Sequence, residues 1–255
     1  MFHTLLSMIT TGFLYSCAMG YPLGVGFLLI FFVHESGHAM MIKLMGLRIK
    51  AMIFLPGLAF VSLKDQPRSL WVESIIGIGG PLFGCIGGVI ALVAGMYFTT
   101  GYWSQLLIVL AWISFTTDLF CLLPLRPLDG RRITQHFKPW YWIPGCLLMA
   151  AMAYFSLYVT GNAHPLVMYI LLLGVMHGVA GFCHHLFHSK RLIDRLKRKP
   201  NRAWDNSKIT PNQRRLVALS YFGLCAILLV LAIFAGQHKP PVDAELAKIR
   251  AIQFY

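Results

Sequence analysis

Apolar residues dominate this chain in runs that are long enough to cross a lipid bilayer, and short polar or basic segments separate the runs. A membrane-spanning helix needs about 20 predominantly apolar residues. The pattern therefore predicts an all-α polytopic membrane protein with about seven transmembrane helices. The predicted spans cover approximately residues 5–19, 22–46, 75–98, 103–123, 142–160, 165–187 and 216–235. In the third span, Gly80, Gly84 and Gly88 recur every fourth residue, and this stripe predicts one smooth face for close contact with a neighbouring helix.

Residues 49–63 break the helical pattern after the second predicted span. The segment is apolar and rich in strand-forming residues, it is too short to cross a bilayer, and Pro56-Gly57 at its centre is a turn signal. We expect a membrane-dipping β-hairpin here, which must be covered by protein or line a wet cavity. A loop at the membrane interface is the alternative.

Composition and charge agree with a membrane protein and predict its orientation. Hydrophobic residues make up 57% of the 255 residues and charged residues only 12%, which excludes an ordinary soluble domain. Residues 43–68, 126–138 and 190–215 hold five, four and ten of the 22 Lys and Arg residues. Because positive loops stay in the cytoplasm, the N-terminus is predicted to be cytoplasmic. The net charge of +13 then reflects topology, and no nucleic-acid partner is expected.

The segments outside the spans carry simpler signals. The first residues, Met1-Phe2-His3, lack the basic region of a signal peptide, so the first apolar run is interpreted as a retained helix. Residues 189–215 are predicted to form a basic cytoplasmic loop and residues 241–255 a short amphipathic tail. The six cysteines lie in or beside apolar runs, which is typical of buried thiols.

The second predicted span carries the most informative polar cluster, the H-E-x-x-H motif of residues 34–38. On a helix, His34 and His38 lie one turn apart on the same face, so both imidazoles can reach one zinc ion. Glu35 lies beside them and can accept a proton from a zinc-bound water. A carboxylate at the bilayer centre costs about 2.5–3.5 kcal/mol on insertion scales, which indicates a functional role. The predicted orientation places the motif in the cytoplasmic half of its span.

A catalytic zinc site needs a third protein ligand and an open position for water. Asp129 follows a helix break at Pro124 and Pro127, and the break can turn its carboxylate inward. We therefore predict His34, His38 and Asp129 as the ligands of one Zn²⁺ ion. Asp118, in the fourth span, either orients a ligand histidine or pairs with a polar neighbour in the helix bundle.

The sixth predicted span contains further histidines. A second metal site or a delivery path for zinc is one interpretation of them. The alternative is a set of interfacial side chains beside the basic loop. His177 is the deepest of the four and the better candidate for a role. The four residues are His177, His184, His185 and His188.

Three elements, in this order, resemble the site-2 protease family of intramembrane zinc metalloproteases, peptidase family M50. The first is the motif at residues 34–38 within a span. The second is the sequence Gly-Gly-Pro-Leu-Phe-Gly at residues 79–84, and the third is Leu-Asp-Gly at residues 128–130, preceded by Pro124. The resemblance covers roughly residues 20–135 and implies a minimal member of the family, without PDZ or CBS domains.

The chain departs from the family pattern at two positions. Cys121 stands where the family usually has asparagine, and Gly84 ends the glycine-proline segment where asparagine is common. In the family these asparagines are thought to help hold the substrate. Cys121, Gly84 and the neighbouring Pro81 are therefore candidate substrate-handling residues, together with Asp118 and His177 as candidate supporting residues.

The resemblance implies a single integral-membrane metalloprotease domain over residues 1–240, with a catalytic core at about 20–135. Its expected activity is cleavage of a transmembrane segment of a membrane-anchored regulatory protein, with Glu35 as the catalytic base, in a bacterial cytoplasmic membrane. The hairpin offers a strand edge for an extended substrate. Two alternatives stay open at this point: a non-catalytic relative that binds membrane helices, and a zinc transporter that uses the histidines of the sixth span.

Overall fold

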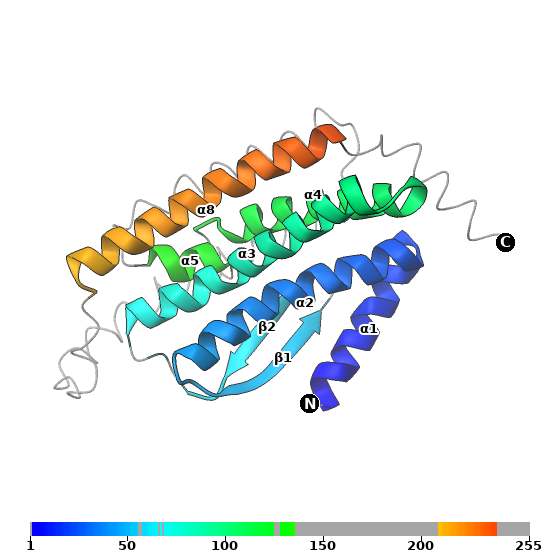
Figure 1. The fold of residues 1–255 in the computed structure, drawn as a ribbon. Coiled ribbons are helices and arrows are strands. Elements are labelled where there is room, and N and C mark those ends of the chain that lie inside the picture. The colour runs from blue at the N-terminus through cyan, green and yellow to red at the C-terminus, as the bar shows by residue number, and fades with distance from the viewer. Residues whose placement is uncertain are drawn as a thin grey trace, which may run out of the picture.

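The computed structural model describes residues 2–55, 58–65, 67, 69–124, 128–135 and 209–238. It is mostly helical, with one β-hairpin after the second helix (Figure 1). The elements are α1 (Phe2–Met19), α2 (Tyr21–Leu44), β1 (Ile49–Leu55), β2 (Leu58–Leu63), α3 (Leu70–Val93), the π-helical turn η1 (Ala94–Phe98), α4 (Gly101–Cys121), α5 (Asp129–Thr134) and α8 (Pro211–His238).

Among the described residues, four helices are long and apolar enough to cross a membrane: α2, α3 continued by η1, α4 and α8. They match the second, third, fourth and seventh predicted spans, and the chain is an integral membrane protein. Helix α1 matches the first predicted span but is shorter than these four. Helix α3 begins at Leu70, five residues earlier than predicted, because the Ser69 side chain caps it by accepting a hydrogen bond from the Val72 N–H.

Several predictions fall on residues that the structure does not describe. The fifth and sixth predicted spans, the four histidines of the sixth span, most of the basic loop at 189–215 and the tail at 241–255 all lie outside the described residues. Their roles stay predictions.

The hairpin predicted at residues 49–63 is confirmed. Strands β1 and β2 pair antiparallel, from Ile49 opposite Leu63 to Leu55 opposite Leu58. Helix α1 holds the outer edge of β1 at Phe54, which donates its N–H to Ser7 Oγ (3.2 Å) and accepts a hydrogen bond from Thr11 Oγ1 at its carbonyl (3.0 Å). One edge of the two-stranded sheet is therefore already occupied by the protein itself.

An ion pair closes the open end of the hairpin. Arg48 donates from Nε and Nη2 to the two carboxylate oxygens of Asp65, at 2.9 and 2.8 Å. The same carboxylate also accepts the backbone N–H of Arg48. These hydrogen bonds from Arg48 hold the pKa of Asp65 at about 2, so the carboxylate stays ionised in all but strongly acid solution.

Glycines let α3 lie close to its neighbours on both sides. Gly37 of α2 faces Gly79 of α3, and a Cβ at Gly37 would collide with the Gly79 carbonyl. The predicted stripe of Gly80, Gly84 and Gly88 is present, but its members do not share one neighbour. Gly80 faces α2, whereas Gly84 and Gly88 face α4. The stripe therefore makes room for side chains of both flanking helices.

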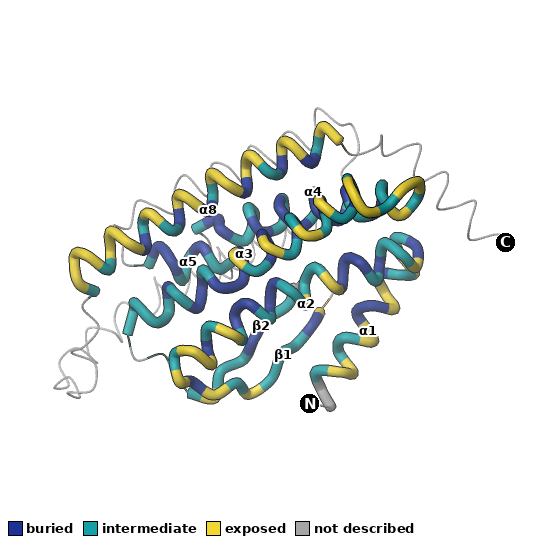
Figure 2. Tube along the Cα trace, in the orientation of Figure 1, coloured by how far each residue is buried: buried dark blue, intermediate teal, exposed yellow. Residues whose placement is uncertain are grey.

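The faces that α2, α3 and α4 turn toward one another are the buried ones, while α8 exposes most of its outward face (Figure 2). Helix α8 covers α4 and α3 with apolar residues such as Leu228, which is fully buried and belongs to the same apolar cluster as Phe115 of α4. Tyr221 of α8 also donates a hydrogen bond to the Leu122 carbonyl at 2.7 Å. This contact holds the end of α4, directly before the helix break that leads to Asp129.

Candidate metal centre

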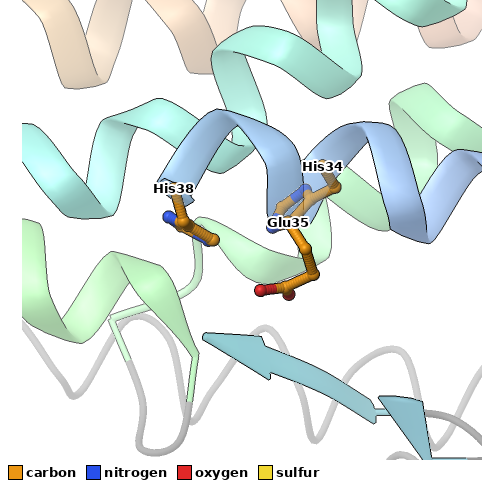
Figure 3. A group of neighbouring side chains, drawn as sticks. All are labelled: His34, Glu35 and His38. Carbon is orange, nitrogen blue, oxygen red and sulfur yellow. The ribbon is translucent and has the colours of Figure 1, made fainter. Parts of the chain in front are cut away.

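Helix α2 places His34, Glu35 and His38 in one buried turn, deep between the helices (Figure 3). The relative exposure of the three residues is 5%, 4% and 3%. The two imidazole rings lie 5.0 Å apart between centroids, at a steep interplanar angle of 75°. The helical spacing of four residues thus brings two potential metal ligands to one point, as the sequence predicted.

Asp129, at the start of α5, follows His34 by 95 residues in the sequence and lies at the same point in the fold. Its Oδ2 atom lies 3.1 Å from Nε2 of His34 and 3.1 Å from Nε2 of His38. The next residue must be small, because a side chain at Gly130 would collide with the carbonyl groups of Leu122 and Leu123. The Asp-Gly sequence therefore lets α5 pack closely against the end of α4, with the Asp129 carboxylate directed toward the histidines.

The other ring nitrogens of the two histidines are held by acceptors. His38 Nδ1 donates to the Ile76 carbonyl of α3 at 2.7 Å. His34 Nδ1 lies 2.7 Å from Oδ1 of Asp118 on α4. A carbonyl or a carboxylate can only accept, so each Nδ1 carries the proton and each Nε2 of a neutral ring presents a lone pair. Two lone pairs and a carboxylate oxygen then face one another, an arrangement that calls for a cation between them.

Distances and space at this point fit a zinc ion. Two ligands bonded to tetrahedral zinc at about 2.0–2.1 Å lie roughly 3.3–3.4 Å apart, close to the 3.1 Å separations of Asp129 Oδ2 from the two rings. Gly80 keeps the neighbouring space open. A Cβ atom at this position would lie 2.6 Å from His34 Nε2 and closer still to His38 Nε2. Histidine and aspartate are also common zinc ligands.

Glu35 lies beside the point where these ligand atoms meet. Its Oε2 atom is buried and has no hydrogen-bond partner within the described part of the chain. His34, Glu35 and His38 together also form a candidate metal-binding group by the separation of their ligand atoms. A buried carboxylate oxygen without a partner is costly, and a water on an adjacent metal ion would supply the missing donor.

The remaining candidate residues lie at different distances from this point. Asp118 contacts His34, and Gly84 contacts Asp118. Cys121, partly buried at the end of α4, forms a second candidate metal-binding group with His34 and Asp129, in which the ligand atoms lie within 4.8 Å of one another. Pro81 is buried within α3, one residue after Gly80. His177 lies outside the described residues.

Two contributors to the site were not singled out from the sequence as parts of it. Gly80 appeared only as a member of a packing stripe, and the Ile76 carbonyl carries no sequence signal. The position of Gly80 directly before Pro81, in the segment that resembles the family pattern, was the available hint. Both come from α3, which crosses α2 at the motif.

Comparison with known proteins agrees with the motif. Residues 23–100 match the model of peptidase family M50, and this range contains most of α2, the hairpin and α3. A zinc metalloprotease of Methanocaldococcus jannaschii is 34% identical over 107 residues, which cover 40% of this chain and 30% of that protein. The chain thus spans less than a third of the length of this curated relative. A solved structure of a site-2 protease from the same organism aligns with a TM-score of 0.48 and 23% identity, covering 69% of this chain and 85% of that one.

Proposed function

We propose that this chain, which belongs to peptidase family M50, is a zinc-dependent intramembrane endopeptidase. One observation carries the proposal. Two imidazole nitrogens and a carboxylate oxygen meet within 3.1 Å contacts, beside a buried glutamate with an unpaired oxygen. Binding alone does not need such a glutamate, whereas hydrolysis of a peptide bond needs a base next to the attacking water.

His34, His38 and Asp129 would hold the single zinc ion, and the fourth position would stay open for water. Bound there, zinc supplies Lewis acidity, which lowers the pKa of its water toward about 7 and polarises the scissile carbonyl. Glu35 accepts the proton of the attacking water at Oε2 and then delivers it to the nitrogen of the leaving amine. Burial of the three residues of α2 keeps bulk water away from this exchange.

The proposed substrate is a transmembrane segment of a membrane-anchored protein. A helix hides its peptide bonds in internal hydrogen bonds, so the segment must unwind locally and be held in extended form. Strand addition to the hairpin would hold it. Because α1 occupies the outer edge of β1 at Phe54, we propose that the substrate pairs with β2.

The proposed orientation places the N-terminus and the hairpin on the cytoplasmic side of a bacterial cytoplasmic membrane. The basic residues that support it are Lys43 in the last turn of α2, Arg48 shortly after that helix, and those in the segments at 126–138 and 190–215. Helix α2 then enters from the outside, and its motif lies nearer to the cytoplasmic end. Water has a shorter path to the site from that side.

The direct test is Glu35→Gln in the full chain, co-expressed with a tagged single-span membrane protein that the wild-type chain cleaves. We expect cleavage to be lost while the zinc content of the purified variant equals that of the wild type, since glutamine keeps the shape of the side chain but cannot take a proton. Glu73→Gln is the matched control, because the same exchange there alters a contact with Gln135 at the start of α3 and none of the residues proposed to hold zinc. Persistent cleavage by Glu35→Gln would exclude the proposed role of this residue.

A further inference from the structure

The buried acid on α4 touches the proposed metal centre through one of its ligands. Asp118 is only 1% exposed, and its Oδ1 atom lies 2.7 Å from Nδ1 of His34. The contact joins residues 84 positions apart in the sequence, across two membrane-spanning helices. We infer that Asp118 is the positioning residue of His34, and that Gly84 is glycine because its side chain would occupy the place of the Asp118 carboxylate. This inference rests on the proposed zinc site.

The hydrogen bond determines how His34 can bind a metal ion. An ionised carboxylate accepts hydrogen bonds and cannot donate one, so Nδ1 of His34 carries the proton of this hydrogen bond and Nε2 is the free ligand atom. The bond also fixes the plane of the ring, and its negative charge favours a cation bound at the opposite nitrogen, Nε2. His38 donates from the corresponding nitrogen, Nδ1, to a neutral group, the Ile76 carbonyl. The two histidines are thus supported unequally.

Gly84 explains how the acid fits between the helices. A Cβ atom at this position would lie 2.6 Å from Cγ of Asp118 and would overlap both carboxylate oxygens. Any side chain at position 84 therefore excludes the observed placement of Asp118. Ser114, one turn before Asp118 on α4, donates a hydrogen bond to the Gly84 carbonyl at 3.1 Å and fixes the two helices at this level. The observed position of the Asp118 carboxylate therefore requires glycine at residue 84.

This pairing gives the departure from the family pattern at position 84 a physical reason. The resembling family commonly has asparagine there, and an asparagine side chain cannot coexist with this Asp118 carboxylate. The two residues must consequently be exchanged together, which a double-mutant cycle can detect.

A purely structural role for Asp118 disagrees with its surroundings. Its Oδ2 atom is buried and has no hydrogen-bond partner among the described residues. A buried acid with an unpaired oxygen costs stability, so a neutral residue of the same shape that still accepts from His34 Nδ1 need not lower it. The positioning role therefore predicts that Asp118→Asn weakens zinc binding without lowering the thermal stability of the metal-free protein, whereas Asp118→Ala also leaves Nδ1 of His34 without its acceptor.

The test is a double-mutant cycle on the full chain in detergent, read as zinc affinity by competition with a chelator and as the visible spectrum of the Co²⁺-substituted protein. We expect Asp118→Ala to bind zinc about 10- to 100-fold more weakly, the range for residues that orient metal ligands, and its Co²⁺ spectrum to change. Asp118→Asn keeps an acceptor and should lose less. It also serves as the measurable variant if Asp118→Ala does not fold.

Gly84→Ala should weaken zinc binding about as much as Asp118→Ala, and the double variant should be no worse than Asp118→Ala alone. Gly88→Ala is the matched control, because it crowds Phe115 one turn away between the same helices and its effect should be independent of residue 118. If the wild type binds zinc and both Asp118 variants bind it with the same affinity, this inference is overturned while the proposed function is not. Equal effects of Gly84→Ala with and without Asp118 would do the same. A wild-type chain that binds no zinc would overturn the proposed function as well.

Discussion

Gly80 of α3 lies against the metal-facing nitrogen of His34 on α2, so close that a Cβ atom there would be 2.6 Å from Nε2. The same Cβ would overlap Nε2 of His38. The hydrogen at this position of α3 is therefore part of the wall of the proposed metal site. A methyl group in its place would compete with the ion for the same space.

Gly80→Ala is accordingly expected to abolish stoichiometric zinc binding and, with it, cleavage. Metal analysis of the purified variant measures this, with circular dichroism to verify that the helices remain. Gly87→Ala provides the comparison, since it crowds the apolar Val33 on the same helix α2 instead of a ligand. Full zinc content in Gly80→Ala would show that the ion does not lie where these residues place it.

Removal of the Asp129 carboxylate should reduce zinc affinity more than any change at Asp118, beyond about 100-fold, because a ligand is lost rather than a support for one. Asp129→Ala tests this by chelator competition. Asp65→Ala removes an acid from the base of the hairpin, remote from the motif, and should keep the wild-type affinity. Equal zinc affinity in Asp129→Ala and the wild type would remove Asp129 from the proposed ligand set.

The sequence located the site well where its members are neighbours on one helix. Residues 34–38 follow the period of an α-helix, so their common face was predictable. Asp129 was also found from the sequence as a candidate, because two prolines and a glycine mark the helix break around it. Its distance from the histidines depends on how α5 packs under α4, and that comes only from the structure.

The supporting residues could not be assigned from the sequence for a geometric reason. Asp118 had two interpretations, because the rotation of α4 about its axis decides whether the carboxylate meets a histidine or another polar group. The glycine stripe had the same ambiguity. Its four-residue period predicted a smooth face, but successive members drift around the helix, so that Gly80 meets α2 while Gly84 meets α4. Both assignments needed the packed helices.

Helix α1 should contribute to the order of the hairpin through Thr11. Thr11→Val removes the hydrogen bond to the Phe54 carbonyl and leaves a buried acceptor unpaired, at a cost of about 1–3 kcal/mol. Hydrogen exchange of residues 50–54 should therefore become faster. Thr10→Val is the neighbouring control, because the exposed Thr10 hydroxyl donates to the Leu6 carbonyl of its own helix and not to the hairpin strands. Equally fast exchange in both variants would argue against a specific role of Thr11.

The ion pair at the base of the hairpin predicts a pH dependence. Hydrogen bonds from Arg48 hold the pKa of Asp65 at about 2, below its ordinary value of 3.8. A lowered pKa stabilises the folded form above the ordinary value, and the contribution disappears as the pH falls through about 2. Protease susceptibility of the chain next to Asp65 should therefore be greater in Asp65→Asn than in the wild type between pH 5 and 7. The difference should vanish near pH 2, and a difference that grows toward low pH would contradict the ion pair.

The identity of the zinc ligands is the claim on which the other predictions depend, and Cys121 offers a clear alternative because it forms a candidate group with His34 and Asp129. X-ray absorption at the zinc edge of the purified wild-type protein distinguishes the two ligand sets directly. The proposed site of two histidines and one aspartate predicts nitrogen and oxygen neighbours at about 2.0–2.1 Å, with the signature of two imidazoles and without sulfur. A sulfur neighbour at about 2.3 Å, or fewer than two imidazoles, would contradict it.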